Sequence, residues 1–291
     1  MQAFKELLLD LILSALSSFD TMVNNATTAL SGAGGGMIDV ADVWREVLVF
    51  SELLKPFCYF IIGICLLIEL AQVAQKVDII KYEHGIKICI KMVFAKLCID
   101  TAPSFLAACY GQASLWIRSA VNVGGYTSLG TMMQREITSQ FNAVSGLWQV
   151  LGLFLSVMLV ALAIKVCGLL IQVIAFGRMF ELFVYLAVSP LPCAFFPLGD
   201  GTGGGFSRIT LKFFKSFIAV CLQGVMIIVS IRIFNMIIGT AFQNMLNQAS
   251  QAGSASGVIT ELCFTMLLGA IVLVMSVSKC GTWARQIMDA M

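Results

Sequence analysis

Five stretches of this chain are predominantly apolar, and their length limits the fold classes that the chain can adopt. They lie at about 56–75, 91–110, 147–176, 214–239 and 257–278. Each supplies roughly the 20 apolar residues that an α-helix needs to cross the hydrocarbon core of a bilayer. Over the whole chain 59% of residues are hydrophobic and 12% are charged, whereas soluble domains carry about 25% charged residues. The sequence therefore predicts an all-α, polytopic membrane helix bundle with about five transmembrane helices.

A shorter apolar run, 182–196, contains Pro190 and Pro192 and is followed directly by Pro197. As a helix this run would rise only about 22 Å, which is less than the thickness of the hydrocarbon core. Pro190 and Pro192 each remove a helix hydrogen bond, and broken backbone at membrane depth needs cover from protein or water. We therefore expect residues 179–197 to form a proline-broken re-entrant helical segment. A tilted or kinked crossing is the alternative.

The N-terminal residues 1–30 have an amphipathic pattern. Apolar side chains recur with helical spacing at Phe4, Leu7, Leu8, Leu11, Ile12, Ala15, Leu16 and Phe19. This pattern predicts an amphipathic helix lying in the membrane interface. A cleavable signal peptide is the rival interpretation, but Glu6 and Asp10 interrupt the apolar run and no small-residue cleavage site follows it directly.

The distribution of Lys and Arg orients the expected segments. In chain order these are the interfacial helix 1–30, a glycine-rich linker and lead-in 31–46, two spans in 47–110, an extracytoplasmic loop 111–146, two spans with the re-entrant segment in 147–239, an extracytoplasmic loop 240–256, and the last span with a short cytoplasmic tail in 257–291. With the N-terminus outside, ten basic residues face the cytoplasm: Lys76, Lys81, Lys87, Lys91, Arg178, Arg208, Lys212, Lys215, Lys279 and Arg285. This agrees with the positive-inside rule, whereas a crossing by 182–196 would move the last five outside and reverse the bias.

Motifs for catalysis or cofactor binding are missing from the sequence. His84 is the only histidine, and the ten cysteines form no CxxC pair, so we expect neither a metal site nor any other cofactor. The glycine-rich turn 199–205 lacks the Lys-Ser/Thr pair of a phosphate-binding loop. The chain is therefore not expected to be an enzyme.

Ionisable and polar groups inside the apolar runs are the candidate functional residues, because such groups normally face a bundle interior or water. They are Lys165, Arg232, Lys96, Asp100, Glu181 and Gln172. Lys96 and Asp100 are four residues apart, so we expect them to pair on one helix face. Lys165 has no carboxylate near it in sequence and shares a helix face with Gln172. For Lys165 and Arg232, an aqueous path and pairing with another helix or a lipid phosphate both remain open.

Two stretches of the chain resemble the TrbL-type conjugal-transfer family. One is Pro190-Leu-Pro192-Cys-Ala-Phe-Phe196 with the glycine-rich turn and then Phe214-Lys-Ser-Phe-Ile-Ala-Val-Cys-Leu-Gln-Gly224, and the other is the span carrying Lys91, Lys96 and Asp100. The resemblance implies a multi-pass channel subunit of a type IV secretion system in the bacterial inner membrane, with its N-terminus outside and its C-terminus in the cytoplasm. It also implies partners: identical copies in a ring (a pentamer or a hexamer), other secretion subunits and ATPases, membrane lipids, and transported single-stranded DNA with its attached relaxase.

Two other functions remain open from the sequence. A small-solute transporter or ion channel would use the break at Pro190 and Pro192 as a midplane binding site. A non-conducting membrane scaffold would need none of the polar residues to face water.

Overall fold

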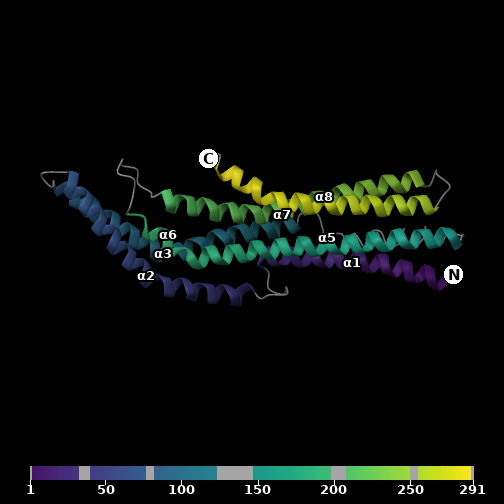
Figure 1. Cartoon of the computed structure of the whole chain (residues 1–291), viewed down its shortest axis with the longest axis horizontal. Helices are drawn as coiled ribbons and strands as arrows, with labels where there is room; N and C mark the ends of the chain where they lie inside the picture. Colours follow the sequence, from purple (N-terminus) through teal and green to yellow (C-terminus); the bar gives the residue numbers. More distant parts are fainter. Residues whose placement is uncertain are drawn as a thin grey trace. The chain divides into compact units, whose positions relative to one another are not determined.

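The chain folds into helices throughout its described part. The computed structural model describes residues 2–32, 40–76, 82–122, 147–197, 208–249 and 255–289. The helices are α1 (Gln2–Ser31), α2 (Val40–Lys76), α3 (Tyr82–Asn122), α5 (Leu147–Val188), α6 (Pro190–Ala194), α7 (Arg208–Ala249) and α8 (Ala255–Asp289), shown in Figure 1. Five candidate membrane spans result: Asp42–Ala71, Ile88–Ala120, Val157–Ala194, Arg208–Ala241 and Cys263–Met288. The expected all-α membrane protein with five helices of spanning length is confirmed.

Several helices continue beyond the apolar runs that predict them. Residues 111–122 belong to α3 and residues 240–249 belong to α7, although both stretches were expected in loops. Neither stretch contains proline. In the first stretch Ala113 and Ile117 are buried in the core, and such packing stabilises a helix beyond its apolar run. The other parts of the expected loops, 123–146 and 250–254, lie outside the described residues, as do the glycine-rich stretches 33–39 and 198–207.

The α-helical hydrogen-bond pattern is interrupted at Ser189, although the backbone there keeps right-handed helical angles (φ −52°, ψ −34°). Helix α5 continues without interruption to Val188, so the first half of the run 182–196 is the end of the third span rather than a separate element. Pro190 then opens the five-residue helix α6. Proline is well tolerated at this first position, because the amide hydrogen that it lacks would have no helical acceptor there. Re-entry of residues 179–197 into the membrane stays a prediction.

The described helices are organised in two compact units. Unit 1 comprises Met1–Met37, Trp116–Gly177 and Gly224–Gly281, and unit 2 comprises Ile38–Leu115, Arg178–Gln223 and Thr282–Met291. The divisions fall inside α3, α5, α7 and α8, so each of these helices contributes to both units.

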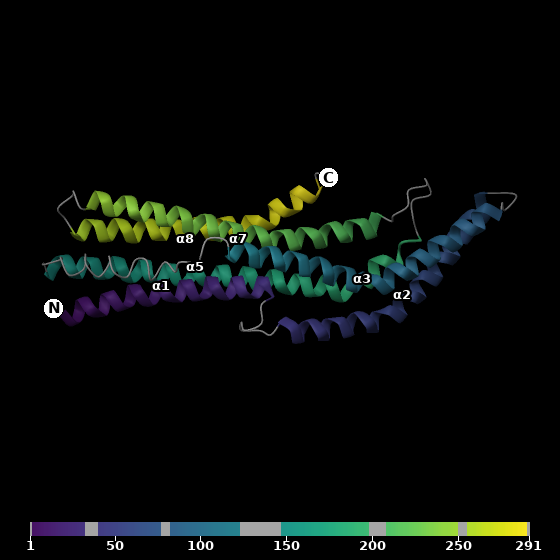
Figure 2. The same cartoon turned by 180° about the vertical axis from the view of Figure 1, so that it is seen from behind.

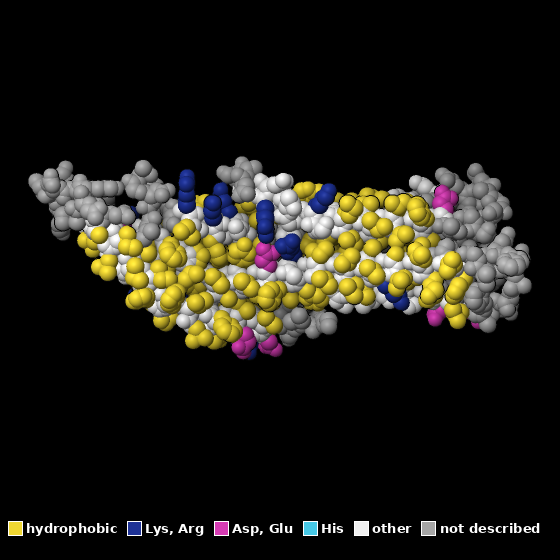
Figure 3. Space-filling model, in the orientation of Figure 1, with side chains coloured by type: hydrophobic (Ala, Val, Ile, Leu, Met, Phe, Trp, Pro, Cys, Tyr) yellow, Lys and Arg dark blue, Asp and Glu magenta, His cyan; other side chains and the backbone are white. Residues whose placement is uncertain are grey.

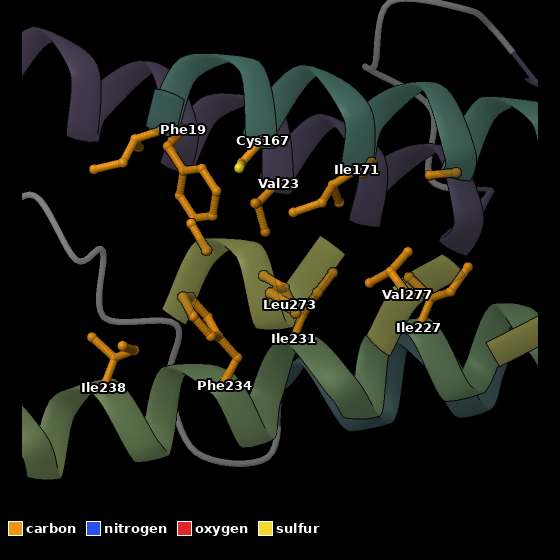
Figure 4. Close-up of a cluster of buried hydrophobic side chains, with 14 of the residues drawn as sticks. Phe19, Val23, Cys167, Ile171, Ile227, Ile231, Phe234, Ile238, Leu273 and Val277 are labelled. Atoms are coloured by element: carbon orange, nitrogen blue, oxygen red, sulfur yellow. The ribbon is translucent and has the colours of Figure 1, made fainter. Parts of the chain in front are cut away.

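Unit 1 is built around the apolar face of α1. This helix lies alongside α5 in both views (Figures 1 and 2), and its buried side chains pack with those of α5, α7 and α8 in one cluster. Figure 4 shows Phe19 and Val23 of α1 among Ile231, Phe234 and Leu273. The amphipathic helix expected for residues 1–30 is therefore present, with its apolar face in contact with protein. Its position in the membrane interface stays a prediction.

The C-terminus of α1 is capped by both local and distant groups. Gly32 has a φ of 61°, a left-handed conformation that glycine adopts without strain and that commonly ends helices. The guanidinium of Arg118 on α3 donates to the carbonyl oxygens of Ser31 (3.2 Å) and Gly32 (3.1 Å). A cation at this end also interacts favourably with the negative pole of the helix dipole. These contacts fix where α1 ends.

Unit 2 holds the proline-broken segment against α2 and α3. Cys193 and Phe196 are buried in a cluster with Ile62 of α2 and Ile99 of α3. The hydroxyl of Thr210 donates to the carbonyl oxygen of Pro192 at 2.7 Å, which satisfies one carbonyl at the break. A second cluster joins Leu186 of α5 to helices α3 and α7. The segment around Pro190 is thus covered by protein, which is the condition for broken backbone inside a membrane.

Apolar side chains cover most of the described surface on the face shown in Figure 3. Among them Leu155 of α5 is 70% exposed and Met236 of α7 is 74% exposed. Large contiguous apolar surfaces are rare on monomeric soluble proteins. The exterior therefore fits a lipid environment or contact with further protein.

Candidate functional site

Lys165 lies on α5 and approaches the polar face of α1. Its ammonium nitrogen Nζ is 3.4 Å from the hydroxyl oxygen of Ser14, and the side chain is half-buried. One turn further along α5, Gly168 leaves room for α1, because a Cβ at this position would lie 3.0 Å from the sulfur of Met22 and 3.1 Å from the ring of Phe19. Lys165 forms no ion pair within the described residues, and the hydroxyl of Ser14 is its hydrogen-bond partner there.

Gln172 follows Lys165 by seven residues, which places both on the same face of α5. Both side chains are half-buried. Together they mark a polar line beside α1, within the candidate span Val157–Ala194.

Arg232 is another cation inside a candidate span of unit 1. It lies in the candidate span Arg208–Ala241 on α7, and its nitrogen Nη2 is buried without a hydrogen-bond partner in the described structure. An unpaired buried guanidinium nitrogen costs free energy unless an anion, a carbonyl or water reaches it. Within the described part of this chain, the guanidinium of Arg232 therefore has an unmet hydrogen-bond donor.

The polar residues of the α2–α3 pair are arranged differently from the expected Lys96–Asp100 pairing. Asp100 accepts a hydrogen bond from the hydroxyl of Tyr59 on α2 at 2.5 Å. Lys96 is exposed and makes no ion pair in the described part of the chain. The spacing of four residues put both on one face of α3, as expected, but a neighbouring helix supplied a closer donor for the carboxylate. A second link between α2 and α3 is the ion pair of Glu69 with Lys91.

Glu181 lies at a small charged cluster in unit 2. It accepts hydrogen bonds from Nη1 of Arg178 at 2.6 Å and from Nη2 of Arg285 at 3.3 Å. The contact with Arg178, three residues earlier on α5, matches the spacing in the sequence, whereas the contact with Arg285 joins α5 to α8. Glu181 therefore acts as a bridge between two helices, and the structure gives it a structural role.

Pro190, Pro192 and Pro197 lie together at the break in unit 2, and all three are buried. Pro190 and Pro192 belong to α6, and Pro197 ends the described segment. Of the candidate residues, Lys165, Gln172 and Arg232 belong to unit 1, whereas Lys96, Asp100, Glu181 and the prolines belong to unit 2.

The structure adds polar groups that the sequence analysis did not single out. Gln223 on α7 is only 2% exposed, and its amide nitrogen has no hydrogen-bond partner in the described part. Tyr59 is the donor to Asp100, and the thiols of Cys98 and Cys193 are 3.3 Å apart. The position of Gln223 inside an apolar run is a sequence signal that could have identified it. No local sequence pattern predicts the contact of Tyr59 with Asp100 or that of Cys98 with Cys193, because each joins two different helices.

No group of three or more His, Cys, Asp or Glu side chains within the described ranges could hold a metal ion. What the described side chains can do is present cations, hydroxyls and amides inside an apolar bundle. Such an arrangement suits the passage or binding of hydrophilic material.

Comparison with known proteins agrees with these features. The family model for TrbL/VirB6 plasmid conjugal transfer like proteins matches residues 40–190, which takes in α2, α3, α5 and the first residue of α6. No curated protein and no solved structure matches the chain. The matched region is more than half of the 291 residues. The chain is a multi-pass membrane protein that belongs to the TrbL/VirB6 plasmid conjugal transfer-like family.

Proposed function

We propose that this chain is a channel subunit of a type IV secretion machine, and that it helps to form a path for single-stranded DNA with its attached relaxase. The observation that carries the proposal is the pair Lys165 and Arg232. Each is a cation inside a candidate span, and neither has an ion-pair partner in the described structure. In a member of a conjugal-transfer family, such cations are well placed to meet phosphate groups.

The small size of one chain supports a ring of several copies. One chain of 31.5 kDa offers five candidate spans, too few to enclose a wide aqueous path, whereas five or six copies around an axis can surround one. The exposed apolar side chains on α5 and α7 supply surface for lipid and for neighbouring copies. Closed cyclic symmetry is the usual arrangement for identical subunits.

The remaining partners follow from the same role. ATPases of the secretion machine would supply the energy for transfer from the cytoplasmic side, and other secretion subunits would continue the path outside. The chain would lie in the bacterial inner membrane, with its N-terminus outside and its C-terminus in the cytoplasm. This orientation follows the positive-inside rule.

The test is a transfer assay in cells whose only copy of the protein is a variant. Lys165→Glu and Arg232→Glu reverse the two charges, and we expect each to lower the frequency of plasmid transfer by about tenfold or more, a barrier change of about 1.4 kcal/mol. The matched controls Lys165→Arg and Arg232→Lys keep the charge and should transfer normally. Membrane insertion and amount of protein are measured by immunoblot of the membrane fraction.

Two results would contradict the proposal. Normal transfer by both charge-reversed variants would remove the two cations from the path. Normal transfer by cells that lack the protein altogether would exclude a role in conjugation, and uptake of a small solute by liposomes holding the pure protein would then identify a transporter.

A further inference from the structure

Helix α1 carries a stripe of uncharged polar side chains opposite its buried face. The α1 stripe consists of Ser14, Ser17, Thr21 and Asn24, and all four are exposed. The exposed carboxylates Glu6 and Asp10 precede it on the same side of the helix. Their spacing of three, four and three residues places them on one side of the helix. Ser17 donates to the carbonyl oxygen of Ser14 at 3.1 Å, and Thr21 donates to that of Ser17 at 2.7 Å. These hydroxyl protons are used within the helix, so the stripe presents mainly oxygen acceptors to its surroundings.

The α1 stripe lies at the level of an apolar run of membrane thickness. The ring of Phe19 lies 6.3 Å from the ring of Phe234 (Figure 4), and a Cβ on Gly269 would lie 3.1 Å from that same Phe234 ring. Gly269 is near the middle of the charge-free run 262–278 of α8, between Glu261 and Lys279. As a helix this run spans about 26 Å, close to the thickness of the hydrocarbon core.

The Asn24 amide makes contact between the stripe and lipid unfavourable at this depth. The amide of Asn24 would lose its hydrogen bonds to water without gaining others, which costs several kcal/mol in an apolar medium, on the order of 2–7. The apolar face of α1 is already occupied by the core of unit 1. The stripe must therefore face water or other polar groups.

The position of Lys165 favours water over other polar groups of the protein. Lys165 of α5 places its ammonium nitrogen 3.4 Å from the hydroxyl of Ser14, at one end of the stripe. A second protein helix packed tightly on the stripe would have to bury this ammonium, which forms no ion pair in the described ranges, and supply it with a partner. Water solvates both the ammonium and the stripe without such a cost.

We propose that the α1 stripe, with Lys165 at one end, lines the aqueous path of the channel. This inference rests on the proposed function and names the wall of its path. It also replaces the interfacial position expected for α1 with a position beside the spans. The hydroxyl and amide side chains of the stripe hydrogen-bond water along the path and bind a charged cargo only weakly.

Cysteine labelling tests this placement. Thr21→Cys and Asn24→Cys are compared with Leu169→Cys and Val173→Cys, which lie on exposed apolar positions of α5 in the same unit (51% and 58% exposed). The background is the full chain with its native cysteines replaced and its membrane insertion verified. We expect an anionic, membrane-impermeant methanethiosulfonate to modify the two stripe positions about tenfold faster than the two controls, a difference of about 1.4 kcal/mol in barrier.

Equal rates at the stripe and the control positions would overturn the proposal. So would efficient oxidative cross-linking of Thr21→Cys between two copies with no reaction toward the reagent, because the stripe would then be a contact between subunits. The labelling does not depend on transfer. A labelled stripe with normal transfer by Lys165→Glu would contradict only the role of Lys165 in DNA passage, and an unlabelled stripe with impaired transfer would contradict only this placement.

Discussion

At the scale of single residues, close packing depends on side chains that are small enough for a neighbouring helix to approach. In lipid, helices associate mainly through van der Waals contact and hydrogen bonds, since lipid tails are as apolar as the side chains. Gly168 is such a position, because Phe19 and Met22 of α1 occupy the space that a side chain would fill. The fit of α1 against α5 thus depends on the absence of one Cβ.

We therefore expect Gly168→Leu to weaken the association of α1 with unit 1. Overpacking of this kind costs about 1–3 kcal/mol, and the measurement is the thermal unfolding midpoint of the purified protein in detergent. Gly177→Leu is the matched control on the same helix, because nothing lies within 4 Å of a Cβ added there. The packing account fails if both variants unfold at the same temperature.

The candidate site shows where sequence reasoning at this scale ends. Helical spacing correctly placed Lys165 and Gln172 on one face of α5, and Lys96 and Asp100 on one face of α3, because the helix period alone decides this. It could not say that Asp100 would accept a hydrogen bond from Tyr59. That contact depends on how α2 and α3 pack, which no local pattern encodes.

At the scale of helices, the proline-broken segment is the element whose position is least determined by its own sequence. The prolines predicted a break, and the hydrogen-bond pattern is interrupted at Ser189 between α5 and α6. The backbone there stays helical, and the candidate span Val157–Ala194 continues through it. The position of α6 depends on contacts with α2 and α3, including the thiols of Cys98 and Cys193 at a distance of 3.3 Å.

That proximity gives a direct test of how α6 packs. Mild oxidation of the native protein in membranes should join Cys98 to Cys193, because their sulfur atoms need to move only slightly to reach the bonding distance of about 2.05 Å. Mass spectrometry of a non-reducing tryptic digest detects the linked peptides. Cys98→Ser is the control and should abolish the linked species.

Recovery of Cys98 joined to other cysteines, and not to Cys193, would show that α6 packs elsewhere. Linkage that appears only after detergent denaturation would lead to the same conclusion. Efficient linkage in the membrane would support the arrangement in which α6 closes against α3, within unit 2.

At the scale of the whole molecule, the five candidate spans and the positions of the charges decide the topology. Apolar runs of membrane length were read correctly from the sequence, because burial in lipid imposes the same requirement on every span. The ends of the helices were not predicted correctly, since α3 and α7 continue past their apolar runs. The division into two units was also not foreseen, because it follows from contacts between distant segments.

The last span allows the orientation to be tested with one matched pair of variants. Gln243→Cys lies near the end of α7 and Gln286→Cys lies near the end of α8, and both positions are polar and exposed. The charge-free run 262–278 of α8 separates them, and Lys279 and Arg285 follow that run. Lys and Arg next to a membrane span are concentrated on its cytoplasmic side, so we expect these cations to hold the C-terminal end of α8 in the cytoplasm.

We therefore expect an impermeant maleimide to label Gln243→Cys in intact spheroplasts and to label Gln286→Cys only after permeabilisation. The background has the exposed native Cys89 replaced, and a cytoplasmic marker protein controls for leakage. The opposite labelling pattern would show that the chain is inserted in the membrane with the reverse orientation. It would also place the basic residues Arg208, Lys212 and Lys215 outside the cytoplasm, against the positive-inside rule. Equal labelling of both positions from outside would mean that α8 does not cross, since a helix that crosses the membrane separates its two ends.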